Sequence, residues 1–142
     1  MKRCEEFTIT RRDFKDMLKV RIYKTNRKMM NGCARTCKYC GYKPPGGIYN
    51  GVWIPTPDAK CEFTGRAAQT DMFGIILLNE EHLTADIIAH ECLHAAFTHS
   101  KYINHYKGNY NDTDYEENFV QYFQDLFETV LFKLREAGYK IK

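Results

Sequence analysis

An apolar run, Phe73-Gly74-Ile75-Ile76-Leu77-Leu78, closed by Asn79, lies just before the helical half of the chain. A run this short, bounded by polar segments, reads as a buried strand. Thr84 follows it and is a suitable N-cap for a helix to about residue 98. A second long helix is predicted over about residues 114–137. Gly138 is its expected C′ residue, because glycine adopts the left-handed conformation there without steric cost.

The first half of the chain is predicted to hold short strands and loops. Apolar and polar residues alternate at Phe7 and Ile9 and again from Leu18 to Ile22, which favours two strands. The segment 13–18 also fits one helical turn. Residues 48–54 alternate well enough for a third strand.

Three segments are predicted to be loops. Residues 31–47 are rich in Cys and Gly and end in Pro44-Pro45-Gly46-Gly47, and residues 55–71 and 99–113 are polar. Strands followed by two helices predict an α+β domain, with a short mixed or antiparallel sheet packed on the helices and a Cys-rich loop.

The length of 142 residues suits one domain with a real core. We expect residues 1–142 to form that domain, with a basic, Cys-rich part over about 1–61 and a core over about 48–142 that contains both predicted long helices. No window approaches eighteen apolar residues, so no transmembrane helix is expected. The first residues of the chain are charged, but no apolar run follows them as in a secretory signal. We therefore expect no secretory signal and a cytoplasmic location.

Charge is distributed unevenly along the chain. Residues 1–43 hold thirteen Lys and Arg against four Asp and Glu, whereas residues 44–142 hold eight against fourteen. A basic first third can contact nucleic acid or another acidic partner. The alternative is a solvated basic face that pairs with the acidic remainder of the chain.

The motif His90-Glu91-Cys92-Leu93-His94 lies on the first predicted helix. Two histidines four apart point the same way, so both imidazoles can bind one Zn²⁺. Glu91 projects toward the same side and can take a proton from a metal-activated water. The opposite face is expected to pack on the core and holds Ala89, Cys92, Leu93 and Ala96. The alternative is a pair of surface histidines beside a charged residue.

A catalytic zinc needs three protein ligands and one open position. His99 and His105 follow the motif and are weak candidates for the third ligand. Glu116 and Glu117, at the start of the last helix, are better ones. A ligand helix must approach the metal helix closely, which favours Glu117, because Val120 follows it at three positions whereas a bulky aromatic residue follows Glu116. Either glutamate can instead be a solvated acid in the first turns of a helix.

His-Glu-x-x-His on one helix with Glu-x-x-Val on a later one resembles the gluzincins, zinc peptidases with a glutamate third ligand. Residues 76–96 together with Glu116-Glu117-x-Phe119-Val120 are similar to small phage-encoded metallopeptidase-like proteins, over about residues 73–139. This resemblance implies a minimal zincin-like fold, zinc ligands His90, His94 and Glu117, and Glu91 as catalytic base. It also implies a host cytoplasm as the location, but no substrate.

The cysteines suggest a second metal site. Cys33-x3-Cys37-x2-Cys40-Gly41 is similar to a metal-binding knuckle, and Cys61 can complete a tetrahedral site with four thiolates. Cys4 is the substitute for Cys61. Structural zinc is therefore predicted there, with free thiols or disulfides as alternatives. Cys92 is expected to be a plain core residue.

Three functions fit these residues. The first is a zinc metallopeptidase with a peptide or protein substrate, in which an oxyanion stabiliser comes from Tyr106, Tyr110, Tyr115 or His105. The second is a catalytically idle module that recognises nucleic acid or a protein through its basic half. The third is a zinc hydrolase of another substrate. The intact Glu91 favours an active enzyme.

Overall fold

The structure is a computed structural model that describes residues 3–10, 17–40, 49–55, 72–106 and 112–142. Within these ranges only the backbone is described at residues 17, 39–40, 72–73, 101–106 and 112–115. The elements are β1 (Glu5–Thr10), β2 (Met17–Tyr23), α1 (Asn26–Cys40), β3 (Val52–Pro55), β4 (Met72–Asn79), the 3-10 turn η1 (Glu80–His82), α3 (Ala85–Tyr106) and α4 (Asp112–Glu136).

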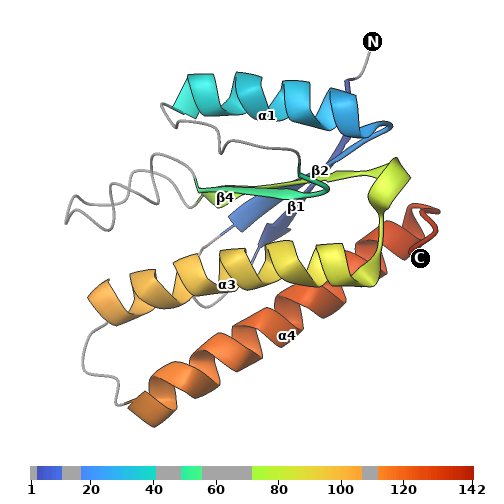
Figure 1. Cartoon of the computed structure of the whole chain (residues 1–142). Coiled ribbons are helices and arrows are strands. Elements are labelled where there is room, and N and C mark those ends of the chain that lie inside the picture. Colours follow the sequence, from blue (N-terminus) through green and yellow to red (C-terminus); the bar gives the residue numbers. More distant parts are fainter. Residues whose placement is uncertain (1–2, 11–16, 41–48, 56–71, 107–111) are drawn as a thin grey trace.

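The four described strands form one mixed sheet in the order β1-β2-β4-β3. β1 and β3 run antiparallel to their neighbours, whereas β2 and β4 pair in parallel at the centre. Figure 1 shows α1 on one face of the sheet and α3 and α4 on the other. The prediction of an α+β domain with a mixed sheet on two late helices is confirmed.

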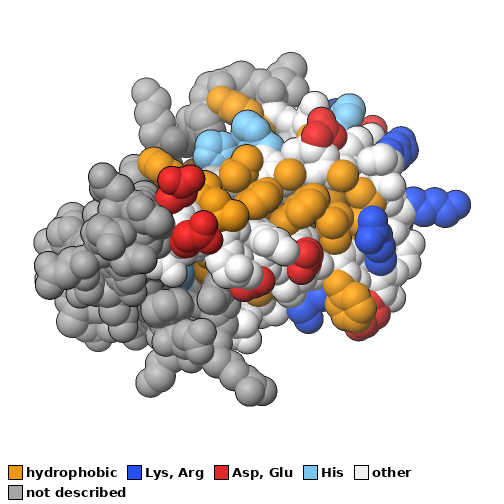
Figure 2. Space-filling model, turned by 90° about the horizontal axis from the view of Figure 1, so that it is seen from below, with side chains coloured by type: hydrophobic (Ala, Val, Ile, Leu, Met, Phe, Trp, Pro, Cys, Tyr) orange, Lys and Arg blue, Asp and Glu red, His pale blue; other side chains and the backbone are white. Residues whose placement is uncertain are grey.

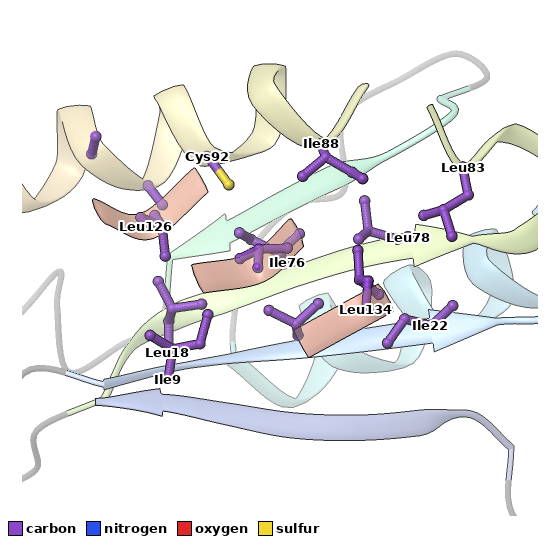
Figure 3. Packing of buried hydrophobic residues seen from close by; sticks show 14 of the residues in the cluster. Ile9, Leu18, Ile22, Ile76, Leu78, Leu83, Ile88, Cys92, Leu126 and Leu134 are labelled. Carbon is purple, nitrogen blue, oxygen red and sulfur yellow. The ribbon is translucent and has the colours of Figure 1, made fainter. Parts of the chain in front are cut away.

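The apolar run of β4 is buried on both faces of the sheet. Ile76 and Leu78 belong to the larger core cluster, together with side chains of α3 and α4 (Figure 3), whereas Ile75 and Leu77 belong to a second cluster with α1. Successive side chains of a strand point to opposite faces, so a strand covered on both faces needs a continuous apolar run. The sequence of β4 therefore fits the central position of this strand.

The two late helices begin and end close to the predicted positions, with one exception. Thr84 starts α3, with its carbonyl accepting from the amide of Ile88 at 3.1 Å. Gly138 has a φ of 92°, and the amide of Tyr139 donates to the carbonyl of Leu134 at 3.0 Å, which together form a Schellman cap. The exception is the predicted loop over 99–113, because α3 continues to Tyr106. The side chains of His99 and Ser100 are buried at the start of this extension, so these two polar residues belong to a packed helix.

The predicted Cys-rich loop is wrong where it overlaps α1. Cys33 and Cys37 lie on this helix, and both side chains are buried in the cluster between α1 and the sheet. The hydroxyl of Thr25 caps the helix by accepting from the amide of Lys28 at 3.1 Å. Gly32 allows the ring of Tyr23 to pack against the helix, since a Cβ there would overlap that ring. None of the described helices combines the length and apolar character needed to cross a membrane.

Candidate metal centre

α3 brings the two motif histidines together at the protein surface. The Nε2 atoms of His90 and His94 lie 3.1 Å apart, and the rings meet edge to face. The side chain of His90 is 67% exposed, so the pair is open to solvent. On the face seen in Figure 2, histidine side chains adjoin hydrophobic ones. Leu93, predicted to pack in the core, is 42% exposed, so that prediction is wrong for Leu93, whereas Cys92 is a core residue as predicted.

The separation of the two nitrogens fits a shared zinc ion. Zn–N bonds of about 2.0–2.1 Å at a tetrahedral angle place two ligand nitrogens about 3.3 Å apart, close to the 3.1 Å observed between His90 and His94. The pKa of His94 is lowered, first by burial and second by the charge of His90. His94 is therefore neutral near pH 7, which is the form that binds a metal.

Glu91 lies on the inner edge of this site, between α3 and the residue that precedes β3. Its side chain is only 5% exposed, and its Oε1 is 4.0 Å from Nε2 of His90. A Cβ on Gly51 would lie 3.0 Å from Cγ of Glu91, so the glycine leaves room for the carboxyl group. Burial raises the pKa of Glu91 to about 7. A carboxyl group with this pKa can accept and release a proton near neutral pH.

Two buried or half-buried asparagines hold the backbone next to Glu91. The side-chain amide of Asn79, at the end of β4, donates to the carbonyl of Asn50 at 2.9 Å. The side-chain amide of Asn26, at the start of α1, donates to the backbone carbonyl of Tyr49 at 2.6 Å. These bonds fix the chain directly before Gly51. Neither residue was predicted from the sequence; the sequence signal for Asn79 is a polar residue directly after an apolar strand, and the structure buries it fully.

β3 is joined to α3 one turn beyond the histidines. Nε1 of Trp53 donates to the hydroxyl of Thr98 at 3.1 Å, and that hydroxyl donates to the carbonyl of His94 at 3.1 Å. Trp53 is half-buried and packs against the larger core cluster. The edge of the sheet is therefore held beside the turn of α3 that carries the site.

Among the side chains that the structure describes, no third zinc ligand lies beside the two histidines. Glu116 and Glu117 are exposed in the first turns of α4. The ring of His99 stacks on that of Tyr122, with centroids 3.8 Å apart. This contact shows that His99 of α3 and Tyr122 of α4 lie at the same height along the two antiparallel helices. At a rise of about 1.5 Å per residue, Glu117 then lies about 15 Å from His94 along the helix axis.

Among the described residues no three metal-binding side chains gather into one group. His99 is buried against α4 and does not join the pair. The identity of the third ligand stays a prediction. The oxyanion candidates Tyr106, Tyr110, Tyr115 and His105 have side chains outside the described part of the structure.

Cys33 and Cys37 form a separate pair in the cluster beneath α1. Their Sγ atoms are 4.0 Å apart, and both are free thiols. Burial and the neighbouring Cys37 raise the pKa of Cys33 to about 12, so this thiol is neutral. Cys4 packs against the same cluster. The side chain of Cys40 and all of Cys61 lie outside the described residues, so the four-cysteine zinc site stays a prediction.

The chain was compared with protein-family models, with curated proteins and with solved structures. It matches none of them. The site itself consists of two converging imidazoles and one buried carboxyl group on the same helix.

Proposed function

We propose that this protein is a zinc-dependent metallopeptidase in which His90 and His94 bind the metal and Glu91 is the general base. The observation that carries the proposal is the 3.1 Å approach of the two Nε2 atoms, with the carboxyl group of the intervening Glu91 at 4.0 Å from one of them. At this distance the two rings can share a hydrogen bond, and a zinc ion bound between the two Nε2 atoms would replace it.

The chemistry of the site follows from these three side chains. Bound zinc would polarise the scissile carbonyl group and lower the pKa of its water. Glu91, next to His90 and buried, is placed to accept a proton from the attacking water and then deliver it to the leaving amine. The close approach of Gly51 to the buried side chain of Glu91 keeps the carboxyl group in place for both transfers.

A peptide substrate is favoured by the position of β3. This strand is at the edge of the sheet and, in the described part of the chain, pairs with β4 alone. An extended peptide can add to such an edge through backbone hydrogen bonds. The bonds from Trp53 to Thr98 and from Thr98 to His94 hold this edge beside the histidines. These contacts support a peptidase over a hydrolase of another substrate.

Glu117 is the third ligand that the proposal uses, with Glu116 as the alternative. Either one requires the first turns of α4 to approach His94 more closely than the antiparallel register places them. Zinc affinity of Glu117→Gln and Glu116→Gln, measured by competition with a chromophoric chelator, separates the two. The ligand variant should lose about 10-fold or more in affinity, and the other should match the wild type.

The test of the proposal combines metal content with cleavage. Zinc is measured by mass spectrometry on untagged protein, and cleavage is followed on a peptide library. Wild type should bind zinc and cleave, Glu91→Gln should retain zinc without cleaving, and His90→Ala/His94→Ala should lose the catalytic zinc. His82→Ala is the control, because His82 is an exposed histidine on η1 outside the site.

Two results would contradict the proposal. One is zinc content unchanged in the double histidine variant, which would place the metal elsewhere. The other is cleavage that persists in Glu91→Gln. A wild-type content of two zinc ions that falls to one in the histidine variant would support a second, structural site at the cysteines.

A further inference from the structure

The exposed side of α1 carries only basic and uncharged side chains. Arg27, Lys28, Arg35 and Lys38 are exposed, and the fifteen residues of the helix include no Asp or Glu. The opposite side, with Met29, Cys33 and Cys37, is buried against the sheet. We call the exposed side, defined by its four cations, the basic face of α1.

The four cations of the basic face form no ion pair with any described residue. Lys19 and Arg21 on the neighbouring strand behave differently, since both pair with Glu6, at 3.5 and 2.6 Å. Within the described part of the chain, therefore, the fold pairs two cations of the sheet with a carboxylate and pairs none of the four on α1.

Helix stability does not explain the positions of these cations. The amino end of a helix carries partial positive charge and favours acidic side chains, yet Arg27 and Lys28 occupy the first turn of α1. The carboxylate of Glu81 lies at this end of α1, where it accepts a hydrogen bond from the backbone amide of Asn26 at 2.6 Å. The acidic residues of α4 belong to the other layer of the molecule, across the sheet (Figure 1).

We propose that the basic face of α1 binds the phosphate backbone of duplex DNA. Arg27 and Lys38, its first and last cations, are eleven residues apart, or about 17 Å along the helix, which spans several phosphates. A helix about 10–12 Å across fits the major groove, which is about 12 Å wide. The exposed side chains of the basic face thus match a polyanion with regularly spaced charges.

Two other anionic partners fit the basic face less well. A helix that binds a membrane surface inserts an apolar side into the lipid, but the apolar side of α1 is buried against the sheet. Single-stranded nucleic acid is held by aromatic rings on which bases stack, and the exposed side chains described on α1 include no aromatic ring.

The basic face and the metal centre lie on opposite sides of the sheet. α1 covers one face, and α3, with His90 and His94, covers the other (Figure 1). DNA binding therefore does not depend on zinc or on cleavage, and it can be tested separately from the proposed peptidase activity.

The experiment measures binding of a fluorescent duplex of about 20 base pairs by anisotropy at several NaCl concentrations. Four phosphate contacts give a slope of log K against log salt of about −3.6, or about a 150-fold loss between 50 and 200 mM. Replacing Arg27, Lys28, Arg35 and Lys38 together by Gln should make the slope shallower by about that amount and weaken binding by at least about 100-fold in low salt. Each half of the set, Arg27→Gln/Lys28→Gln or Arg35→Gln/Lys38→Gln, should account for about half of the slope.

The matched control removes four positive charges from another part of the surface. Lys24, Arg135, Lys140 and Lys142 are all exposed outside α1, and their replacement by Gln should leave the slope nearly unchanged. Circular dichroism checks that each variant keeps its helix content. The α1 variants should also keep the zinc content and the cleavage of the wild type.

Three results would overturn the proposal. Wild type that does not bind the duplex in low salt would exclude it. Equal losses in the α1 and control variants would show a response to net charge alone. Tighter binding to a single strand or to phosphatidylserine vesicles than to the duplex would identify a different partner for this face.

Discussion

The buried carboxyl group of Glu91 should make the stability of the metal-free protein depend on pH. Its pKa of about 7 in the folded protein compares with an ordinary value of 4.5. The unfolded chain therefore loses this proton at lower pH than the folded protein does. The contribution of Glu91 to the free energy of unfolding is therefore fully present below pH 4.5, and it is lost as the pH rises through 7.

The size of the effect follows from the two pKa values. Their difference corresponds to about 3.4 kcal/mol between low and high pH, of which about 2.5 kcal/mol falls between pH 5 and pH 8. Both are upper values, because a small movement of Glu91 toward the exposed His90 would hydrate the carboxylate. Gln at this position removes the titration and keeps nearly the same shape.

The assay is urea unfolding of zinc-free wild type and Glu91→Gln at intervals from pH 5 to pH 8. The difference between the two proteins is the informative quantity, because it cancels groups that titrate in both, such as His94. Wild type should lose stability relative to the variant as the pH rises. Parallel curves for the two proteins would refute the burial of an uncompensated carboxyl group at this site.

Three further predictions concern packing and thiol reactivity. Gly51→Ala should destabilise the protein by about 1–3 kcal/mol in urea unfolding, because the new methyl group would meet two side chains of α3 at 2.9 and 3.0 Å. Leu134→Ala should cost about 2–5 kcal/mol, whereas Phe132→Ala, a matched change at a side chain 64% exposed, should cost little; equal losses would contradict the buried position of Leu134. Cys33, buried and neutral, should react with iodoacetamide far more slowly than the partly exposed Cys4, as followed by peptide mass spectrometry, and equal rates would contradict its burial.

Local signals predicted the parts of the fold that depend on local physics. The apolar run of β4, the Thr84 cap and the Gly138 terminus each act within a few residues, and the structure has all three. The convergence of His90 and His94 is likewise a property of one helical turn. These features could be predicted because their causes lie within the segment itself.

The features that the sequence did not predict depend on distant partners. α1 was missed because Gly32 and the cysteines suggest a turn, whereas the ring of Tyr23 fills the space that the glycine leaves. The burial of Glu91 requires Gly51, forty positions earlier in the chain. The distance between Glu117 and His94 along the helix axis depends on how far α3 extends. The polar residues after Thr98 suggested a loop, so the sequence did not predict this extension.

The parallel pair at the centre of the sheet has a consequence for how the chain folds. Leu18 pairs with Gly74, 56 positions away, whereas the hairpin of β1 and β2 closes between Thr10 and Met17, only seven apart. Closing the longer loop costs about 1.8 kcal/mol more in chain entropy. We therefore expect the hairpin to form early and the β2–β4 contact to limit the folding rate. On the ribosome, the sheet can assemble only after β4 has emerged, when more than half of the chain has been made.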